Sequence, residues 1–201
     1  NALNERALDE LGTIVDHLAR REEVRAGVFT GDGTASFVAG ADIKQFLEEM
    51  HTVEDVLPLP KKAHLAFRKI ERMPKPVIAA VNGVALGGGN EFQMACHYRI
   101  AEPTARFGQP EIALRLLPGY GGTQRLPRLL AARDKKRGLL TALEIMLHGR
   151  QLEAEEALAI GRIDEITYEQ DVVSRATALA REHVLTGRGA LARAFRDRET
   201  M

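Results

Sequence analysis

The chain has 201 residues, with 28 basic and 28 acidic side chains and a formal net charge of +0 at pH 7. This length allows one domain with a sizeable core. The balanced charge gives no strong field toward nucleic acid or an anionic membrane, so neither is expected as a partner. Cys96 is the single cysteine, which excludes an internal disulfide and a cysteine zinc cluster. We expect a reducing compartment such as the cytoplasm, and a mitochondrial matrix fits equally.

Three further features of the sequence concern membrane segments, metal binding and the start of the chain. No apolar run reaches transmembrane length and no signal peptide opens the chain. The six histidines show no metal-ligand spacing, so no metal is assigned. The start at Asn1, without a methionine, suggests a processed, trimmed or excised fragment.

Short strands alternate with helices along the chain, which is typical of an α/β domain with a partly parallel sheet. A stretch with two prolines, residues 52–60, has the composition of a linker. After about residue 133 the chain is predicted to be mostly helical. Strands are predicted over residues 25–30, 77–81, 99–101 and 163–166. Helices are predicted from near Asp42 and over residues 4–21, 61–72, 90–96, 123–132, 139–147, 153–159, 171–185 and 190–198.

A run of three glycines separates a buried strand from a helix. Residues 84–92 have the sequence Val-Ala-Leu-Gly-Gly-Gly-Asn-Glu-Phe. Glycines let the backbone turn sharply and leave no side chain over its amides. The first N–H groups of a helix have no acceptor inside it, so they can bind an anion or a developing oxyanion. Glu91 lies in the first helical turn beside them, although the helix dipole alone also favours a glutamate there.

A second glycine-rich loop leads into the helix predicted from Thr123. The loop follows a Gln-Pro-Glu segment that contains Glu111 and has the sequence Pro-Gly-Tyr-Gly-Gly. Tyr120 either borders a pocket or packs under the loop. Gln124 and Arg125 are expected to fix the loop rather than to touch a ligand.

Four segments in this order resemble the enoyl-CoA hydratase/isomerase (crotonase) superfamily. A fifth piece, residues 149–161, also looks like the helix-turn-helix piece that follows in the family. The four segments are residues 1–3; Thr-Gly-Asp-Gly at 30–33 with Phe-Val-Ala-Gly-Ala-Asp-Ile-Lys at 37–44; residues 76–91; and residues 107–111 with Pro-Gly-Tyr-Gly-Gly-Thr-Gln-Arg-Leu at 118–126.

The resemblance implies the ClpP/crotonase fold, a spiral of ββα units with a helical C-terminal part over residues 133–201. We expect one crotonase-like domain over residues 1–201. Because the chain begins inside the family's first motif, this domain is expected to lack the family's first strand. The resemblance also implies a homotrimer or a dimer of trimers.

The resemblance further implies an acyl-CoA thioester as substrate, with coenzyme A as part of the substrate and no separate cofactor. The family holds the thioester carbonyl between two backbone amides, and by motif match these are the N–H groups of Ala41 and Gly88. Substrate contacts are expected from Gly88 and from the segment Ala39, Gly40, Ala41, Asp42, Ile43 and Lys44. Lys44 would meet a phosphate as a point charge, or is equally a solvated helix lysine.

Family hydratases use two glutamates, and Glu91 and Glu111 match both positions. By the resemblance, Glu111 delivers a proton to the α-carbon and Glu91 orients and deprotonates water, with roles that could be shared. Two close carboxylates in a poorly hydrated cleft are expected to titrate as a coupled pair. The sequence therefore favours a hydratase of 2-enoyl-CoA thioesters.

Other activities stay open on the sequence alone. A double-bond isomerase, hydrolase or decarboxylase of the same superfamily often changes one acidic position, so two glutamates tilt against these. A structural or binding homologue without turnover also stays open. For the RNA-binding homologue known in the family, the balanced charge and the lack of a basic aromatic patch disfavour nucleic acid. A ClpP-like serine peptidase is excluded, since neither Ser36 nor Ser174 lies in the glycine turn.

Overall fold

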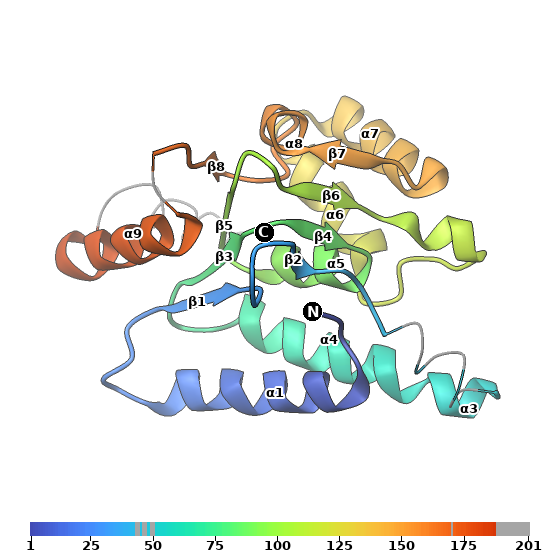
Figure 1. Ribbon diagram of the computed structural model, residues 1–201, viewed down its shortest axis with the longest axis horizontal. Helices are drawn as coiled ribbons and strands as arrows, with labels where there is room; N and C mark the ends of the chain where they lie inside the picture. The colour runs from blue at the N-terminus through green and yellow to red at the C-terminus, as the bar shows by residue number, and fades with distance from the viewer. Residues whose placement is uncertain (43–44, 46–47, 49–50, 170, 188–201) are drawn as a thin grey trace.

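Two four-stranded sheets form the centre of the computed structural model, which describes residues 1–42, 45, 48, 51–169 and 171–187 (Figure 1). The strands of the first sheet, all parallel, are β1 (Gly27–Thr30), β3 (Val77–Val81), β5 (Tyr98–Ala101) and β8 (Glu165–Ile166), in that order. The second has β2 (Ser36–Val38), β4 (Val84–Leu86), β6 (Arg106–Gly108) and β7 (Gln151–Glu153), in that order.

Up to β6, consecutive strands go to different sheets, and this builds a spiral. The pairs β1/β2, β3/β4 and β5/β6 each place their first strand in one sheet and their second strand in the other. Each pair leads on to helical structure: α4 (Pro58–Glu71), α5 (Gly88–Ala95), or the 3₁₀-helix η1 (Pro110–Leu114) with α6 (Gly122–Ala131). The predicted α/β spiral of ββα units is confirmed.

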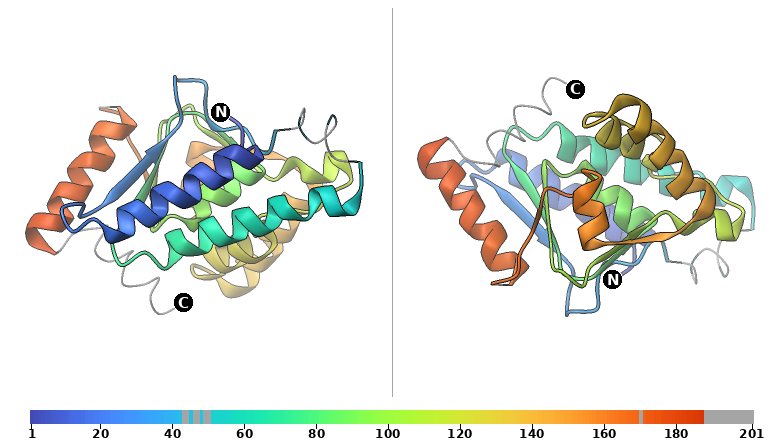
Figure 2. Two further views of the ribbon diagram at one scale, coloured as in Figure 1. Left: turned by 90° about the horizontal axis from the view of Figure 1, so that it is seen from below. Right: turned by 90° about the horizontal axis from the view of Figure 1, so that it is seen from above.

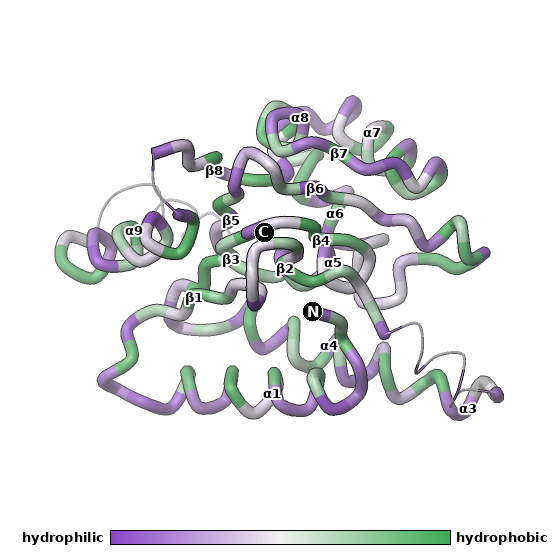
Figure 3. Tube along the Cα trace, in the orientation of Figure 1, coloured by the Kyte–Doolittle hydropathy of each residue, from purple (hydrophilic) through white to green (hydrophobic). Residues whose placement is uncertain are grey.

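The central strand β3 is buried on both faces, as expected for a parallel sheet. Because side chains alternate along a strand, Val77, Ala79 and Val81 enter the main core while Ile78 and Ala80 face the opposite way. That opposite face is covered by α9 (Val172–Thr186). Helix α9 and the apolar strands it covers are visible in Figures 1 and 3.

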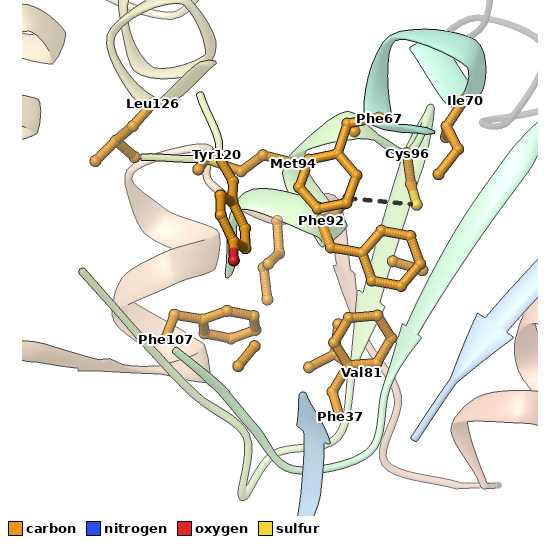
Figure 4. Close-up of a cluster of buried hydrophobic side chains, with 14 of the residues drawn as sticks. Phe37, Phe67, Ile70, Val81, Phe92, Met94, Cys96, Phe107, Tyr120 and Leu126 are labelled. Atoms are coloured by element: carbon orange, nitrogen blue, oxygen red, sulfur yellow. Dashed lines mark hydrogen bonds between the residues drawn. The ribbon is translucent and has the colours of Figure 1, made fainter. Parts of the chain in front are cut away.

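The main core is organised around Phe92 of α5. Its ring centroid lies 5.2 Å from that of Phe29 and 5.5 Å from those of Phe37 and Phe67. Figure 4 shows three of these rings together, with the backbone carbonyl of Phe92 facing the thiol of Cys96. Cys96 is part of this core, since its side chain is fully buried. Because Phe92 points into the core, the preceding residue, Glu91, points to another side of the helix.

Two long helices, α1 (Glu5–Arg20) and α4, lie below the sheets in Figure 1 and side by side in Figure 2. Asn4 caps α1 by accepting from the N–H of Ala7. The linker predicted over residues 52–60 is wrong. Residues 53–56 form α3 (Val53–Val56), and α4 already begins at Pro58, because proline fits the first helical turn, where no N–H acceptor is needed.

The C-terminal part contains α7 (Lys135–His148), α8 (Ala154–Ala159) and α9, with β7 and β8 between them. Strand β7 pairs antiparallel with β6 and was not predicted. The helix predicted over residues 190–198 lies outside the described residues. No helix in the described part of the chain has the length and apolar character needed to cross a membrane.

Candidate active site

The glycine run forms a tight junction between β4 and α5. The helix begins at Gly88, two residues before the predicted start at Asn90, and the extra strand β4 precedes it. Gly87 has φ 49° and ψ −123°, a conformation that side chains other than glycine rarely adopt. A Cβ on Gly87 would lie 3.3 Å from Oε1 of Glu111, and one on Gly88 would lie 2.8 Å from the Tyr120 ring. The run therefore brings three separate segments to one point.

Glu91 is buried, with 1% of its surface exposed. Its Oε1 accepts hydrogen bonds from the N–H of Tyr120 at 2.9 Å and from the N–H of Gly122 at 2.6 Å. Burial raises the pKa of Glu91 to about 7, the nearby charge of Glu111 adds to the rise, and the two backbone donors oppose it. The carboxyl group therefore exchanges its proton near neutral pH.

Glu111 lies in η1, just after β6 ends. Its Oε1 accepts a hydrogen bond from Nε2 of Gln109 at 3.0 Å. Its Oε2 is buried without a hydrogen-bond partner among the described residues. Burial raises the pKa of Glu111 as well, against opposing effects of its own backbone and of the Arg162 guanidinium.

The structure brings the two glutamates together, which their spacing of twenty residues could not show. Strands β4 and β6 are parallel neighbours, so the segments that follow them leave the sheet at the same edge. A Cβ on Gly122 would lie 2.7 Å from Nε2 of Gln109 and 2.9 Å from Oε1 of Glu91. The side-chain amide of Gln109, which donates to Glu111, and the carboxyl group of Glu91 thus both lie against Gly122.

A chain of three buried amides leads to Glu111. Nε2 of Gln93 donates to Oδ1 of Asn90 at 3.0 Å, Nδ2 of Asn90 donates to Oε1 of Gln109, and Gln109 donates to Glu111. All three amide side chains are 0% exposed. The oxygens of Asn90 and Gln109 each accept from the preceding amide, so these two side chains direct their N–H₂ groups along the chain toward Glu111. Sequence reasoning missed Gln109, Asn90 and Gln93, since nothing in their spacing indicates a chain.

The loop that holds Glu91 is fixed by Arg125. This side chain donates to the carbonyl of Tyr120 at 2.7 Å and to both carboxylate oxygens of Glu71 at 2.7 and 3.0 Å. Its guanidinium carbon also lies 5.6 Å from the centroid of the Phe67 ring. The expectation that Arg125 fixes the loop agrees with these contacts. The Tyr120 ring packs at 6.3 Å against Phe67, so it lies under the loop.

The N–H groups of Ala41 and Gly88 are the two amides expected to bind a thioester oxygen, and the backbone hydrogen bonds around them bear on this expectation. In the parallel bridge between Leu3 and Ala41, the N–H groups of Leu3 and Asp42 make the hydrogen bonds, so the bridge does not use the N–H of Ala41. Gly88 is the first residue of α5, where an N–H has no acceptor within the helix. Gly40 links the two segments, because a Cβ on Gly87 would lie 3.9 Å from its Cα atom.

The remaining predicted contacts are only partly described. Ala39 donates its N–H to the carbonyl of Asn1, and Oδ1 of Asp42 accepts from the N–H of Gln45 at 3.4 Å. Ile43 and Lys44 lie outside the described residues, as does most of the helix expected after Asp42. No group of three or more His, Cys, Asp or Glu side chains suited to a metal occurs in the described part of the chain.

Alternating strands in two sheets, a glycine turn into a buried helix and two linked glutamates define a crotonase-like α/β protein. The family model for enoyl-CoA hydratase/isomerase matches residues 1–197. The chain therefore belongs to the enoyl-CoA hydratase/isomerase family, as the resemblance predicted.

Relatives and solved structures agree with this assignment. The chain is 41% identical over 92% of its length to a short-chain-enoyl-CoA hydratase of Clostridium acetobutylicum, and 42% identical over 90% to a crotonyl-CoA hydratase of Syntrophomonas wolfei. It spans 67% and 66% of those two proteins. An enoyl-CoA hydratase structure from Bacillus anthracis superposes with a TM-score of 0.85 at 32% identity, covering 98% of this chain and 72% of that one.

Proposed function

We propose that the protein adds water to a 2-enoyl-CoA thioester and forms a 3-hydroxyacyl-CoA. The observation that carries this proposal is the meeting of two carboxyl groups beside the glycine turn, Glu91, which is buried, and Glu111, whose Oε2 is buried. Relatives at about 41% identity bear enoyl-CoA and crotonyl-CoA hydratase names, which supports the same reaction. Coenzyme A is part of the substrate, and the mechanism needs no further cofactor.

The chemistry divides between a base, an acid and two amides. Glu91 takes a proton from water as the water oxygen bonds to the β-carbon of the enoyl group. The electron pair of the double bond moves toward the thioester, and the N–H groups of Ala41 and Gly88 stabilise the negative charge on its oxygen. Glu111 then gives its proton to the α-carbon. One proton enters at Glu91 and one leaves from Glu111, so the pair holds one proton before the reaction and one after it.

The buried site supplies this single proton. Two carboxyl groups that act on each other do not ionise independently, and removal of the first proton makes removal of the second harder. The raised pKa values of both glutamates agree with such a pair. We therefore expect a bell-shaped dependence of the rate on pH, and a flat profile between about pH 5 and 9 contradicts the two-carboxyl mechanism.

The finer features of the proposal follow from the motif match. The segment from Ala39 to Lys44 and the N–H of Gly88 bind the coenzyme A thioester, with Lys44 toward a phosphate. The protein works in the cytoplasm or a mitochondrial matrix and assembles as a homotrimer or a dimer of trimers.

The test is crotonyl-CoA hydration by the protein, followed as loss of absorbance of the conjugated thioester. Glu91→Gln and Glu111→Gln keep the shape of each side chain and remove its ability to exchange a proton. Each is expected to lower kcat by at least about a hundredfold and to retain acyl-CoA binding. Glu144→Gln is the matched control, because this glutamate is exposed on α7.

Each result leads to a distinct conclusion. Full activity in either variant would refute the assigned role of that glutamate. If the protein binds acyl-CoA without hydrating it, isomerase, hydrolase or decarboxylase substrates become the next to test. Failure to bind any acyl-CoA would overturn the functional proposal and leave the fold unaffected.

A further inference from the structure

Arg162 is a charged side chain enclosed by the protein. It lies in the turn between α8 and β8 and is 0% exposed. None of its three guanidinium nitrogens has a hydrogen-bond partner within the described part of the chain. Its guanidinium carbon lies 5.6 Å from the centroid of the Phe107 ring, in the strand that leads to Glu111.

Such an arginine is unfavourable for folding. Taking a guanidinium out of water costs several kcal/mol unless a partner compensates, and an apolar side chain of similar volume is often equally stable or more so. The ring of Phe107 offers a cation–π contact, which returns only part of this cost. The burial of Arg162 therefore points to a role other than stabilising the fold.

The surrounding charges leave Glu111 as the counter-charge. Asp164 is paired with the other nearby arginine, Arg99. The backbone N–H of Arg99 lies 2.8 Å and its Nη2 lies 2.6 Å from Oδ2 of Asp164. The charge of Glu111 favours the charged form of Arg162, whereas Arg99 opposes it, and Arg162 in turn favours the ionised form of Glu111. Oε2 of Glu111 is itself buried without a described partner.

We propose that Arg162 is a positioning residue for the proton of the glutamate pair: its charge holds Glu111 ionised in the ligand-free protein, so that the shared proton resides on Glu91. This role rests on the proposed function. With Glu91 protonated and Glu111 ionised, the resting protein has the protonation state that hydration leaves behind. The reverse reaction begins from this state, with Glu111 as the base that removes the α-proton.

The electrostatics agree in sign. Burial first and the charge of Arg99 second lower the pKa of Arg162 to about 9, and the charge of Glu111 opposes this decrease. Arg162 thus stays charged at neutral pH. The guanidinium in turn lowers the pKa of Glu111 against the effect of burial. Removing the positive charge should raise the pKa of Glu111 by about one unit, as expected for opposite charges within a protein interior.

The direct test is a carbon-13 NMR titration of the glutamate carboxyl groups in the unliganded protein, with Glu111→Gln used to assign the Glu111 signal. In Arg162→Met the apparent pKa of Glu111 is expected to rise by about one unit. Arg162→Gln, which is also neutral but polar, is a second variant and should give the same shift. Arg150→Met is the control, because this arginine is exposed and pairs with Glu156.

The kinetic test uses the same variants. Removing Arg162 should move the acid limb of the pH profile of kcat/KM to higher pH. The alkaline limb should stay in place, because it reports loss of the last proton from Glu91 with Glu111 already ionised. An unchanged Glu111 titration in both neutral variants, or an equal shift in Arg150→Met, would overturn the role of Arg162. Because the NMR titration needs no substrate, it distinguishes this result from a failure of the hydratase proposal, which would appear as no turnover in the unaltered protein.

Discussion

Asn90→Ala would interrupt the buried amide chain at its middle. Asn90 makes two side-chain hydrogen bonds, one from Gln93 and one to Gln109. The substitution leaves Oε1 of Gln109 and Nε2 of Gln93 without partners. An orphaned buried polar group costs about 1–3 kcal/mol, so we expect the free energy of unfolding to fall by about 2–6 kcal/mol, with the two orphaned groups as its source.

Gln93→Met gives the matched comparison. It keeps the length of an unbranched side chain and orphans only Oδ1 of Asn90, so about 1–3 kcal/mol is expected. It also removes Oε1 of Gln93, which is buried without a partner among the described residues, and this offsets part of the loss. In the Gln93→Met background, Asn90→Ala orphans one group instead of two. The double variant should therefore be at least about 1 kcal/mol more stable than the sum of the single effects implies.

Urea unfolding of the four proteins measures this coupling, provided that the dependence on denaturant is the same in all four. If the loss of stability in the double variant equals the sum of the two single losses to within about 0.5 kcal/mol, the amides do not interact, and their hydrogen-bonded arrangement contributes nothing to stability. A negligible effect of Asn90→Ala would likewise refute the reasoning.

Two further predictions concern the same site. The pKa of Glu91 is raised from 4.5 to about 7, so the folded protein binds more protons than the unfolded chain in this range. The contribution of Glu91 to stability should be fully present below about pH 4.5 and be lost, by about 3 kcal/mol, as the pH rises through 7, and Glu91→Gln should remove this part of the pH dependence in urea unfolding curves. Arg125→Lys cannot contact both Glu71 oxygens and the Tyr120 carbonyl in the same way. It should lower kcat for crotonyl-CoA about tenfold or more, with little change in KM, and a change in KM alone would contradict a loop-fixing role.

Local patterns in the sequence determined much of the fold. The apolar run at Val77–Val81, the amphipathic helix after Asn4 and the helix capped by Asp171 were predicted close to their observed bounds. Each depends on residues next to one another along the chain, through side-chain periodicity and capping. The glycine turn with Glu91 in the first turn of its helix was recognisable for the same reason.

Short strands and the first residues of helices were harder to predict from the sequence. Strands β4 and β7 have three residues each, too few for a periodic pattern, and they exist because β6 lies between them as their hydrogen-bonding partner. The prolines at 58 and 60 suggested a linker, although proline is equally suited to the first turn of a helix. A neighbour in space, rather than the local residues, decided these elements.

The site divides along the same line. The sequence determined which residues carry carboxyl groups and where the backbone turns without side chains. Only the tertiary structure decided that Glu91 accepts hydrogen bonds from the N–H groups of Tyr120 and Gly122, and that Gln109 donates to Glu111 close to the same point. Burial, pKa and hydrogen bonding depend on strands and loops that meet from distant parts of the chain, and local residue preferences do not specify which segments will meet.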